Sequence, residues 1–140
     1  MLHNQNTQWL KNESEIWKNW YPKRGEVYVI DLGEEGIGSE QKGQRPAVIL
    51  SNNLNNKYSE IIQIAPITSA KKTNLPVHVK LDIKNGLRTE SLVCLEQTRC
   101  VSKKRGLING NLIRICQLNN KKIEEIDLAI KIQFSLSCSL

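Results

Sequence analysis

The chain is poor in the residues on which metal-dependent and histidine-based catalysis rely. Its 140 residues include only two histidines and four cysteines. His3 lies near the beginning of the chain, no histidine lies at ligand spacing from a cysteine, and no two cysteines form a Cys-x-x-Cys pair. The sequence therefore predicts no zinc site and no disulfide framework. It also offers no serine, histidine and aspartate in the order of a hydrolase triad, and we expect no metal and no cofactor.

Long apolar runs are also missing. A helix that crosses a bilayer needs about 20 consecutive apolar residues, and no stretch of the chain approaches that length. Asn, Gln, Lys and Glu interrupt the first residues throughout, which is not typical of a signal peptide. We therefore expect a cytoplasmic protein that does not contact a membrane.

Acidic residues are fewer than basic ones, so the net charge is +6. A basic surface favours a polyanionic partner, either nucleic acid or an acidic protein. Charged residues make up 24% and hydrophobic residues 39% of the chain, which is ordinary for a folded domain. The length suits one domain with a modest core.

Aromatic residues are scarce, and all three tryptophans lie within the first twenty residues. The apolar members of this segment recur at three- and four-residue steps, as on one stripe of a helix: Trp9, Leu10, Ile16, Trp17 and Trp20. Residues 1–22 are therefore predicted to form an amphipathic helical extension, which Pro22 ends. Its stripe must dock on its own domain, on a second subunit or on another protein. Residues 23–140 are predicted to form the main domain.

The main domain is predicted to be mainly β, with short strands and long loops. Val77, Val79, Leu81 and Ile83 alternate with polar residues, so His78 is expected at a surface or an edge. The expected strands are 26–32, about 45–51, 60–66 (ended by Pro66), 75–83 and 91–95, with a turn-rich connection at 52–56, a polar loop at 67–74, a turn at 85–86 and a final helix over 121–136. Strands this short favour a small closed or half-closed barrel over a doubly wound sheet.

One stretch, from Gly38 to Ser51, joins a polar loop to a buried strand. The loop of residues 33–44 is too irregular for a tight hairpin and has the length of a functional loop. Pro46 fixes its own φ and pushes Arg45 toward an extended conformation. Arg45 is therefore expected at a strand mouth, where a permanent positive charge can meet an anion. An ordinary turn before a strand explains the same pattern.

Five motifs, in order and at fitting spacing, resemble those of the MazF/PemK toxin family. They are Gly38–Gln41, Arg45–Ser51, Ala65–Ser69, Leu75–Val79 and Leu95–Arg99. The resemblance spans about residues 23–136. It implies a small SH3-like β-barrel with a C-terminal helix, to which the N-terminal amphipathic helix is an addition. It also implies a homodimer that cleaves single-stranded RNA at specific sequences without a metal and that a cognate antitoxin protein neutralises.

The same resemblance assigns roles to individual residues. It gives the catalytic arginine as Arg45 and the catalytic threonine as Thr68, with Glu40 as a candidate base. The other implied RNA contacts are Ser39, Gln41, Ser69, Lys71, Lys72 and Gln97. Metal-free cleavage can use the 2′-OH of the substrate as the nucleophile, which leaves a 2′,3′-cyclic phosphate and a 5′-OH. A planar guanidinium matches the oxygens of the scissile phosphate.

Two alternatives stay open at the level of sequence. Related toxins of the same fold poison a protein target such as gyrase without enzymatic activity, and a silent homologue could bind RNA or antitoxin only. Lys103, Lys104 and Arg105 either add phosphate contacts or form a solvated turn. Gly106 departs from the Arg-Leu pair that is frequent in the family, which leaves the role of Arg105 open.

Overall fold

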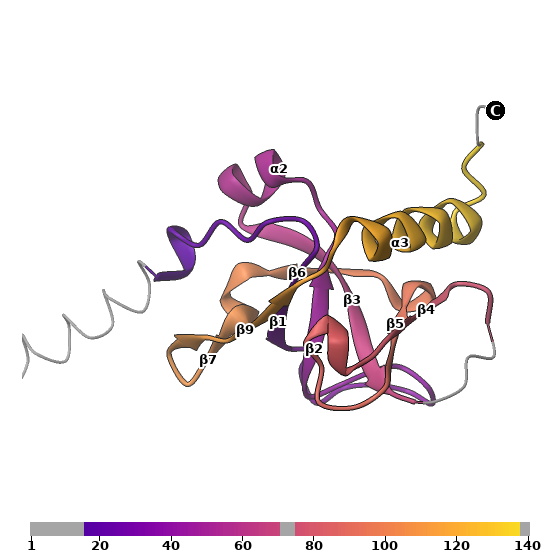
Figure 1. The fold of residues 1–140 in the computed structure, drawn as a ribbon. Coiled ribbons are helices and arrows are strands. Elements are labelled where there is room, and N and C mark those ends of the chain that lie inside the picture. Colours follow the sequence, from indigo (N-terminus) through magenta and orange to yellow (C-terminus); the bar gives the residue numbers. More distant parts are fainter. Residues whose placement is uncertain (1–15, 71–74, 138–140) are drawn as a thin grey trace, which may run out of the picture.

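A computed structural model describes residues 16–70 and 75–137 of the chain. An antiparallel sheet with the strand order β4-β5-β3-β2-β1-β9, in which β6 also pairs with β3, forms the body of the molecule (Figure 1). Its strands are β1 (Glu26–Asp31), β2 (Gln44–Ile49), β3 (Ile61–Ser69), β4 (His78–Leu81), β5 (Ser91–Cys94), β6 (Arg99–Ser102) and β9 (Arg114–Gln117). The predicted mainly β fold with a C-terminal helix is confirmed.

The remaining elements are short, except for the last helix. A small separate hairpin pairs β7 (Leu107–Ile108) with β8 (Asn111–Leu112). The helices are α2 (Asn53–Tyr58) and α3 (Asn120–Gln133), and the 3₁₀ turns are η1 (Ile83–Asn85), η2 (Leu95–Gln97) and η3 (Lys103–Gly106). None of the helices in the described part of the chain is long and apolar enough to cross a membrane.

Strand β3 is the centre of the sheet because it changes partner along one edge. Its first half, Ile61–Ile64, pairs with β6, and its last residues, Ile67–Ser69, pair with β5. The sheet curls at this change of partner (Figure 1). Pro66 lies in the gap between the two pairings, so its missing N–H is tolerated there. The prediction that Pro66 ends this strand is therefore wrong.

Two clusters of buried side chains form the core, one on each face of the curled sheet. The first contains Val48, Ala65 and Val93 and is covered by Ile126 and Ala129 of α3. The second is made by Trp20, Tyr28, Ile30, Ala47, Ile49, Ile62, Ile64 and Val101. The alternation of side chains along each strand divides the apolar residues between the two clusters.

The described end of the N-terminal extension packs on the main domain. Trp17 and Trp20 are buried, and the ring of Trp20 meets Tyr28 edge-on, with ring centroids 4.9 Å apart. A Cβ atom on Gly106 would lie 2.5 Å from two ring carbons of Trp20, so only glycine fits beneath the indole. Trp9 lies outside the described residues, and the boundary at residue 22 stays a prediction.

Several local predictions are wrong, each for a physical reason. The connection after β2 is the helix α2, which the side chain of Asn52 caps by accepting from the Asn55 N–H. Ile83 is 70% exposed because β4 stops at Leu81 and η1 begins at Ile83. Lys103 is buried rather than solvated, and burial lowers the pKa of its ammonium group.

The last helix agrees with its prediction except at its ends. It spans Asn120–Gln133 instead of 121–136, and the side chain of Asn119 caps its beginning by accepting from the Lys122 N–H. Ile126 and Ala129 face the core, whereas Phe134 is more than half exposed.

Candidate active site

Arg45 stands near the start of β2, just after the loop of residues 33–44. It is half-buried, and its Nε donates to the Lys42 carbonyl oxygen at 2.8 Å. Within residues 16–70 and 75–137, no carboxylate forms an ion pair with it. Its neighbour Pro46 pairs with Val29 of β1, so the strand holds the backbone next to it. The guanidinium therefore has no acidic partner among the described residues at the strand mouth.

Thr68 reaches the same place from the neighbouring strand. The pairing of β2 with β3 runs as far as Ala47 opposite Pro66. If this antiparallel register is continued by two residues, Arg45 comes opposite Thr68. Their side chains therefore leave the sheet on the same face. Thr68 is half-buried and pairs with Leu92 of β5. Its hydroxyl makes no hydrogen bond with any residue that the structure describes.

Gln97 joins the loop of residues 33–44 to the turn η2. Its Oε1 accepts from the Gln41 N–H at 2.8 Å, and its Nε2 donates to the Ser39 carbonyl oxygen at 3.1 Å. The Glu40 carboxylate closes a turn inside the same loop, where Oε2 accepts from the Ile37 N–H at 3.0 Å. These hydrogen bonds therefore hold the tip of the loop, whereas the sequence alone predicts only an irregular polar loop.

A groove of about 540 Å³ opens between this loop and η2. Three of the predicted site residues line it, namely Glu40, Gln41 and Gln97. Pro66, two residues before Thr68, lines it as well, and its other lining residues are Glu35, Gly36, Ile37, Glu96, Thr98 and Arg99. The groove thus combines hydrogen-bonding amides with charges of both signs.

The other predicted contacts fall in two places. Ser69 is exposed at the end of β3, with its Oγ 3.4 Å from Oγ1 of Thr89. Lys71 and Lys72 lie outside the described residues. The side chain of Arg105, whose role the sequence leaves open, donates from Nη1 to the Asp31 carbonyl oxygen at 3.1 Å, so Arg105 is tied to β1.

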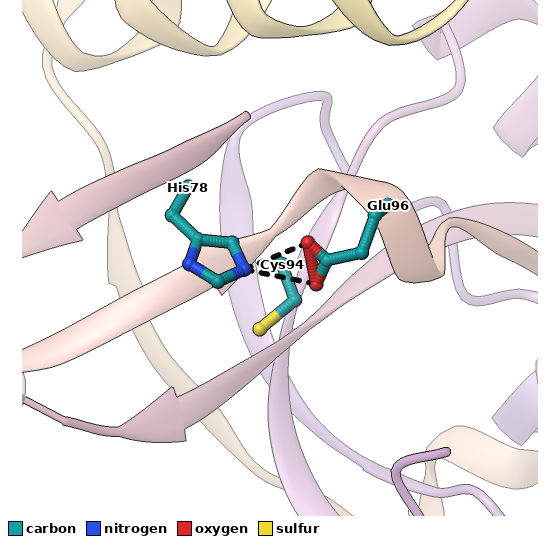
Figure 2. A group of neighbouring side chains, drawn as sticks. All are labelled: His78, Cys94 and Glu96. Atoms are coloured by element: carbon teal, nitrogen blue, oxygen red, sulfur yellow. Dashed lines mark hydrogen bonds and ion pairs between the residues drawn. The ribbon is translucent and has the colours of Figure 1, made fainter. Parts of the chain in front are cut away.

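Sequence reasoning missed a cluster of three side chains beside this site. His78 lies on the edge strand β4, as predicted, but its ring is half-buried, with Nε2 3.0 Å from Oε1 and 2.7 Å from Oε2 of Glu96 (Figure 2). Cys94 lies directly across the β4–β5 pairing from His78. One ligand atom from each of the three residues lies within 4.8 Å of the others. No local spacing reveals the cluster, because pairing of two strands creates it.

The cluster is electrostatically linked to Arg45. Burial and, to a lesser extent, the negative charge of Glu96 raise the pKa of the Cys94 thiol to about 12, although the positive charge of Arg45 opposes them. The thiol is therefore protonated at neutral pH, and it lies within electrostatic reach of both Arg45 and Glu96. Arg45, Cys94 and Glu96 belong to one neighbourhood of the curled sheet.

A curled antiparallel sheet with a helix after its last strand is a fold also found in toxins of known structure. The chain resembles MazF from Deinococcus radiodurans with a TM-score of 0.67 and 21% identity, covering 84% of this chain and 99% of that one. It resembles an endoribonuclease in complex with its cognate antitoxin from Mycobacterial species with the same TM-score, identity and coverage. These likenesses show the fold.

The sequence comparisons show the family. Residues 23–134 match the family described as the PemK-like, MazF-like toxin of type II toxin-antitoxin systems. The chain is 36% identical over 116 residues to Endoribonuclease EndoA of Bacillus subtilis (strain 168), covering 81% of this chain and 95% of that protein. The chain belongs to the PemK-like, MazF-like toxin family.

Proposed function

We propose that this chain is the toxin of a type II toxin–antitoxin module and that it acts as an endoribonuclease on single-stranded RNA. Family membership and the 36% identity to Endoribonuclease EndoA support the activity. The observation that carries the proposal is the position of Arg45, which has no carboxylate partner in the described part of the chain and stands beside Thr68 at the mouth of the sheet. An uncompensated guanidinium next to a free hydroxyl is suited to a phosphodiester.

In the proposed reaction, the 2′-OH of the substrate attacks the adjacent phosphorus and the bond to the 5′-oxygen breaks. Arg45 binds the phosphate oxygens and stabilises the charge that develops on them. Thr68 hydrogen-bonds a phosphate oxygen or the 2′-OH. Glu40 is the candidate base, because Ile37 uses only its Oε2 and Oε1 stays available for the proton of the 2′-OH. The leaving 5′-oxygen takes a proton from water, so the products are a 2′,3′-cyclic phosphate and a 5′-OH.

The groove between the loop and η2 is proposed to hold the bases next to the scissile phosphate. Bases must be unstacked to be read, so the substrate is single-stranded. The side-chain amide of Gln41 suits base edges, and Gln97 lines the same groove while its own amide holds the loop. The remaining proposed contacts are Ser39, Ser69, Lys71 and Lys72, which offer hydroxyl groups and positive charge to the RNA.

The proposal extends to partners and location. A cognate antitoxin protein blocks the RNA-binding surface, and a solved relative is in complex with its cognate antitoxin. The chain acts as a homodimer in the cytoplasm, and it cleaves specific sequences and so inhibits translation. None of the similar proteins named above supports the alternative of a non-enzymatic toxin that poisons gyrase.

The test is cleavage of a long single-stranded RNA by the purified chain in EDTA. We expect cuts at one short sequence, with a 2′,3′-cyclic phosphate on the upstream fragment and a 5′-OH on the downstream fragment. A matched substrate with a single 2′-deoxy nucleotide before the cut should stay intact, because it lacks the nucleophile. Cleavage of the deoxy substrate would contradict the mechanism, and an uncut RNA with a correctly folded protein would contradict the function.

A further inference from the structure

The cluster of His78, Cys94 and Glu96 has the chemistry of a metal site. Histidine nitrogen, cysteine sulfur and carboxylate oxygen are the three ligand types that zinc takes in proteins. One ligand atom from each residue lies within 4.8 Å of the others, and the three residues come from β4, β5 and η2 (Figure 2). In a tetrahedral zinc site, such atoms lie roughly 3.3–3.8 Å apart, so small side-chain rotations would bring them to ligating positions.

We infer that His78, Cys94 and Glu96 form a binding site for a zinc ion. Three protein ligands leave the fourth tetrahedral position open to water or to another ligand. The backbone supports two of the ligands, because His78 and Cys94 are directly paired across β4 and β5. Glu96 follows Cys94 by two residues, in the turn η2.

Burial and charge distinguish this cluster from a chance surface group. Cys94 is 2% exposed, and the side chains of His78 and Glu96 are 13% and 22% exposed. The Nδ1 atom of His78 is buried and finds no hydrogen-bond partner among the described residues. Because the three groups are largely shielded from water, they gain more from a bound cation than exposed groups do.

The ion exchanges with a proton. Cysteine ligates zinc as the thiolate, so the Cys94 thiol must lose its proton when the ion binds. Binding forms a zinc–sulfur bond, and the thiol proton passes to solvent. The thiolate and the Glu96 carboxylate then balance the two positive charges of the ion. Arg45 stays positive nearby and favours the thiolate.

The site also lies against the proposed RNA groove. Glu96 lines that groove, and His78 lines a second groove between β4 and α3. A zinc ion would therefore be reached from the groove side, and it would take the Glu96 carboxylate out of the groove wall. This consequence rests on the proposed function: zinc should slow RNA cleavage, although cleavage itself needs no metal.

The first test measures cobalt binding, which needs no RNA and so cannot fail together with the proposed function. In a variant with Cys100, Cys116 and Cys138 replaced by serine, Cys94 is the only thiol. Cobalt(II) should bind at one equivalent, with the visible absorption of a tetrahedral site and a thiolate charge-transfer band in the ultraviolet. Zinc should displace it. Absence of the charge-transfer band would overturn the site.

Two further variants in the same background test Cys94 and Glu96 as ligands of the metal ion. Cys94→Ala should abolish the charge-transfer band, and Glu96→Gln should weaken cobalt binding about 100-fold or more, because losing a direct ligand exceeds the ~10–100-fold cost of losing a group behind one. His3→Ala is the matched control and should bind as the parent does. Far-UV circular dichroism identifies any variant that does not fold. If Cys94→Ala does not fold, cobalt binding by Glu96→Gln, which keeps a hydrogen-bonding group, tests the site instead. Unchanged binding by a folded Cys94→Ala or Glu96→Gln protein would overturn the site.

The second test concerns the consequence for RNA cleavage. The ratio of the rate in EDTA to the rate with one equivalent of zinc should exceed one clearly in the parent protein. In Cys94→Ala the ratio should be close to one. Equal slowing of both proteins would overturn the link between this site and the groove.

Discussion

Polar residues lie near both ends of strand β2, and their side chains are bonded differently. After its last residue, the side chain of Asn56 is fully buried: its Nδ2 donates to the carbonyl oxygens of Pro22 at 2.9 Å and Ser51 at 2.8 Å, and its Oδ1 accepts from the Ser51 hydroxyl. At the other end, Arg45 makes one hydrogen bond, from Nε. Its two terminal nitrogens find no partner in the described part of the chain.

Three arginines differ in the same way, in whether an acidic side chain pairs with them. Arg24 joins the start of the main domain to α3 through an ion pair with Asp127, Nη2 to Oδ1, at 2.7 Å. Arg114 pairs with the buried carboxylate of Glu26 and so links β9 to β1. Arg45 has no such acid among the described residues. The difference teaches that an arginine paired with an acid holds two elements together, whereas one without an acid is available for an anionic ligand.

Arg45→Ala should have the largest effect on activity and almost none on stability. Removing a preorganised cationic donor from the transition state costs about 10²–10³-fold in kcat. Because no described acid loses a partner, the free energy of unfolding should change by less than about 0.5 kcal/mol. The measurements are single-turnover cleavage of an RNA oligonucleotide and urea unfolding. Full cleavage by the variant would remove Arg45 from the active site.

Asn56→Ala should have the opposite profile. It leaves the carbonyl oxygens of Pro22 and Ser51 buried without a donor, which should cost about 2–3 kcal/mol of unfolding free energy. The folded variant should still cleave RNA at 25 °C at close to the parent rate. Urea unfolding and the cleavage assay check both statements. If Asn56→Ala lost activity without losing stability, the two ends of β2 would not differ as described.

Gln97→Ala should have the smallest effect of the three and should act on the loop. It removes the bonds to Gln41 and Ser39, so the loop of residues 33–44 should become a better substrate for limited proteolysis. We expect kcat/KM for RNA to fall about 10-fold, since one well-placed interaction is worth roughly 1.4 kcal/mol. The change in unfolding free energy should stay near 1 kcal/mol or below.

Gln97→Glu is the control for this prediction. Its carboxylate still accepts from the Gln41 N–H but can no longer donate to the Ser39 carbonyl oxygen. Proteolysis of the loop should fall between those of the parent and Gln97→Ala. Identical loop proteolysis in all three proteins would show that Gln97 does not hold the loop.

The sequence predicts those strands in which apolar and polar residues alternate. It also predicts the backbone conformation next to a proline. The first, second and fifth strands lie close to their expected positions, because their β-branched residues are buried on a sheet. Arg45 reaches the expected strand mouth because Pro46 restricts it locally. Pro66 does not end its strand, because it lies between the stretch of β3 that pairs with β6 and the stretch that pairs with β5. Its missing N–H therefore removes no hydrogen bond from either pairing.

What sequence cannot supply here is contact between distant residues. His78, Cys94 and Glu96 meet through the register of β4 against β5, and no local pattern encodes that register. Lys103 reads as part of a basic, solvated turn, yet it is buried near the ring of Tyr21, with Nζ 5.5 Å from the ring centroid. The resemblance implies only an RNA contact for Gln97, and it gives no sign that the Gln97 amide is hydrogen-bonded to the loop of residues 33–44.

Because Trp20 packs under η3, tryptophan fluorescence reports on the contact between the N-terminal segment and the main domain. All three tryptophans lie in the first twenty residues, so the main domain from residue 23 onward contains none. Light absorbed selectively by indole therefore reports on the N-terminal segment and on the surface it covers, beside Gly106 and Tyr28. A shift of the emission maximum during unfolding follows the detachment of this segment, whereas in a Tyr21→Phe variant the tyrosine signal comes from Tyr28 in the sheet and Tyr58 in α2. Comparing the two wavelengths resolves whether the segment leaves before the sheet opens.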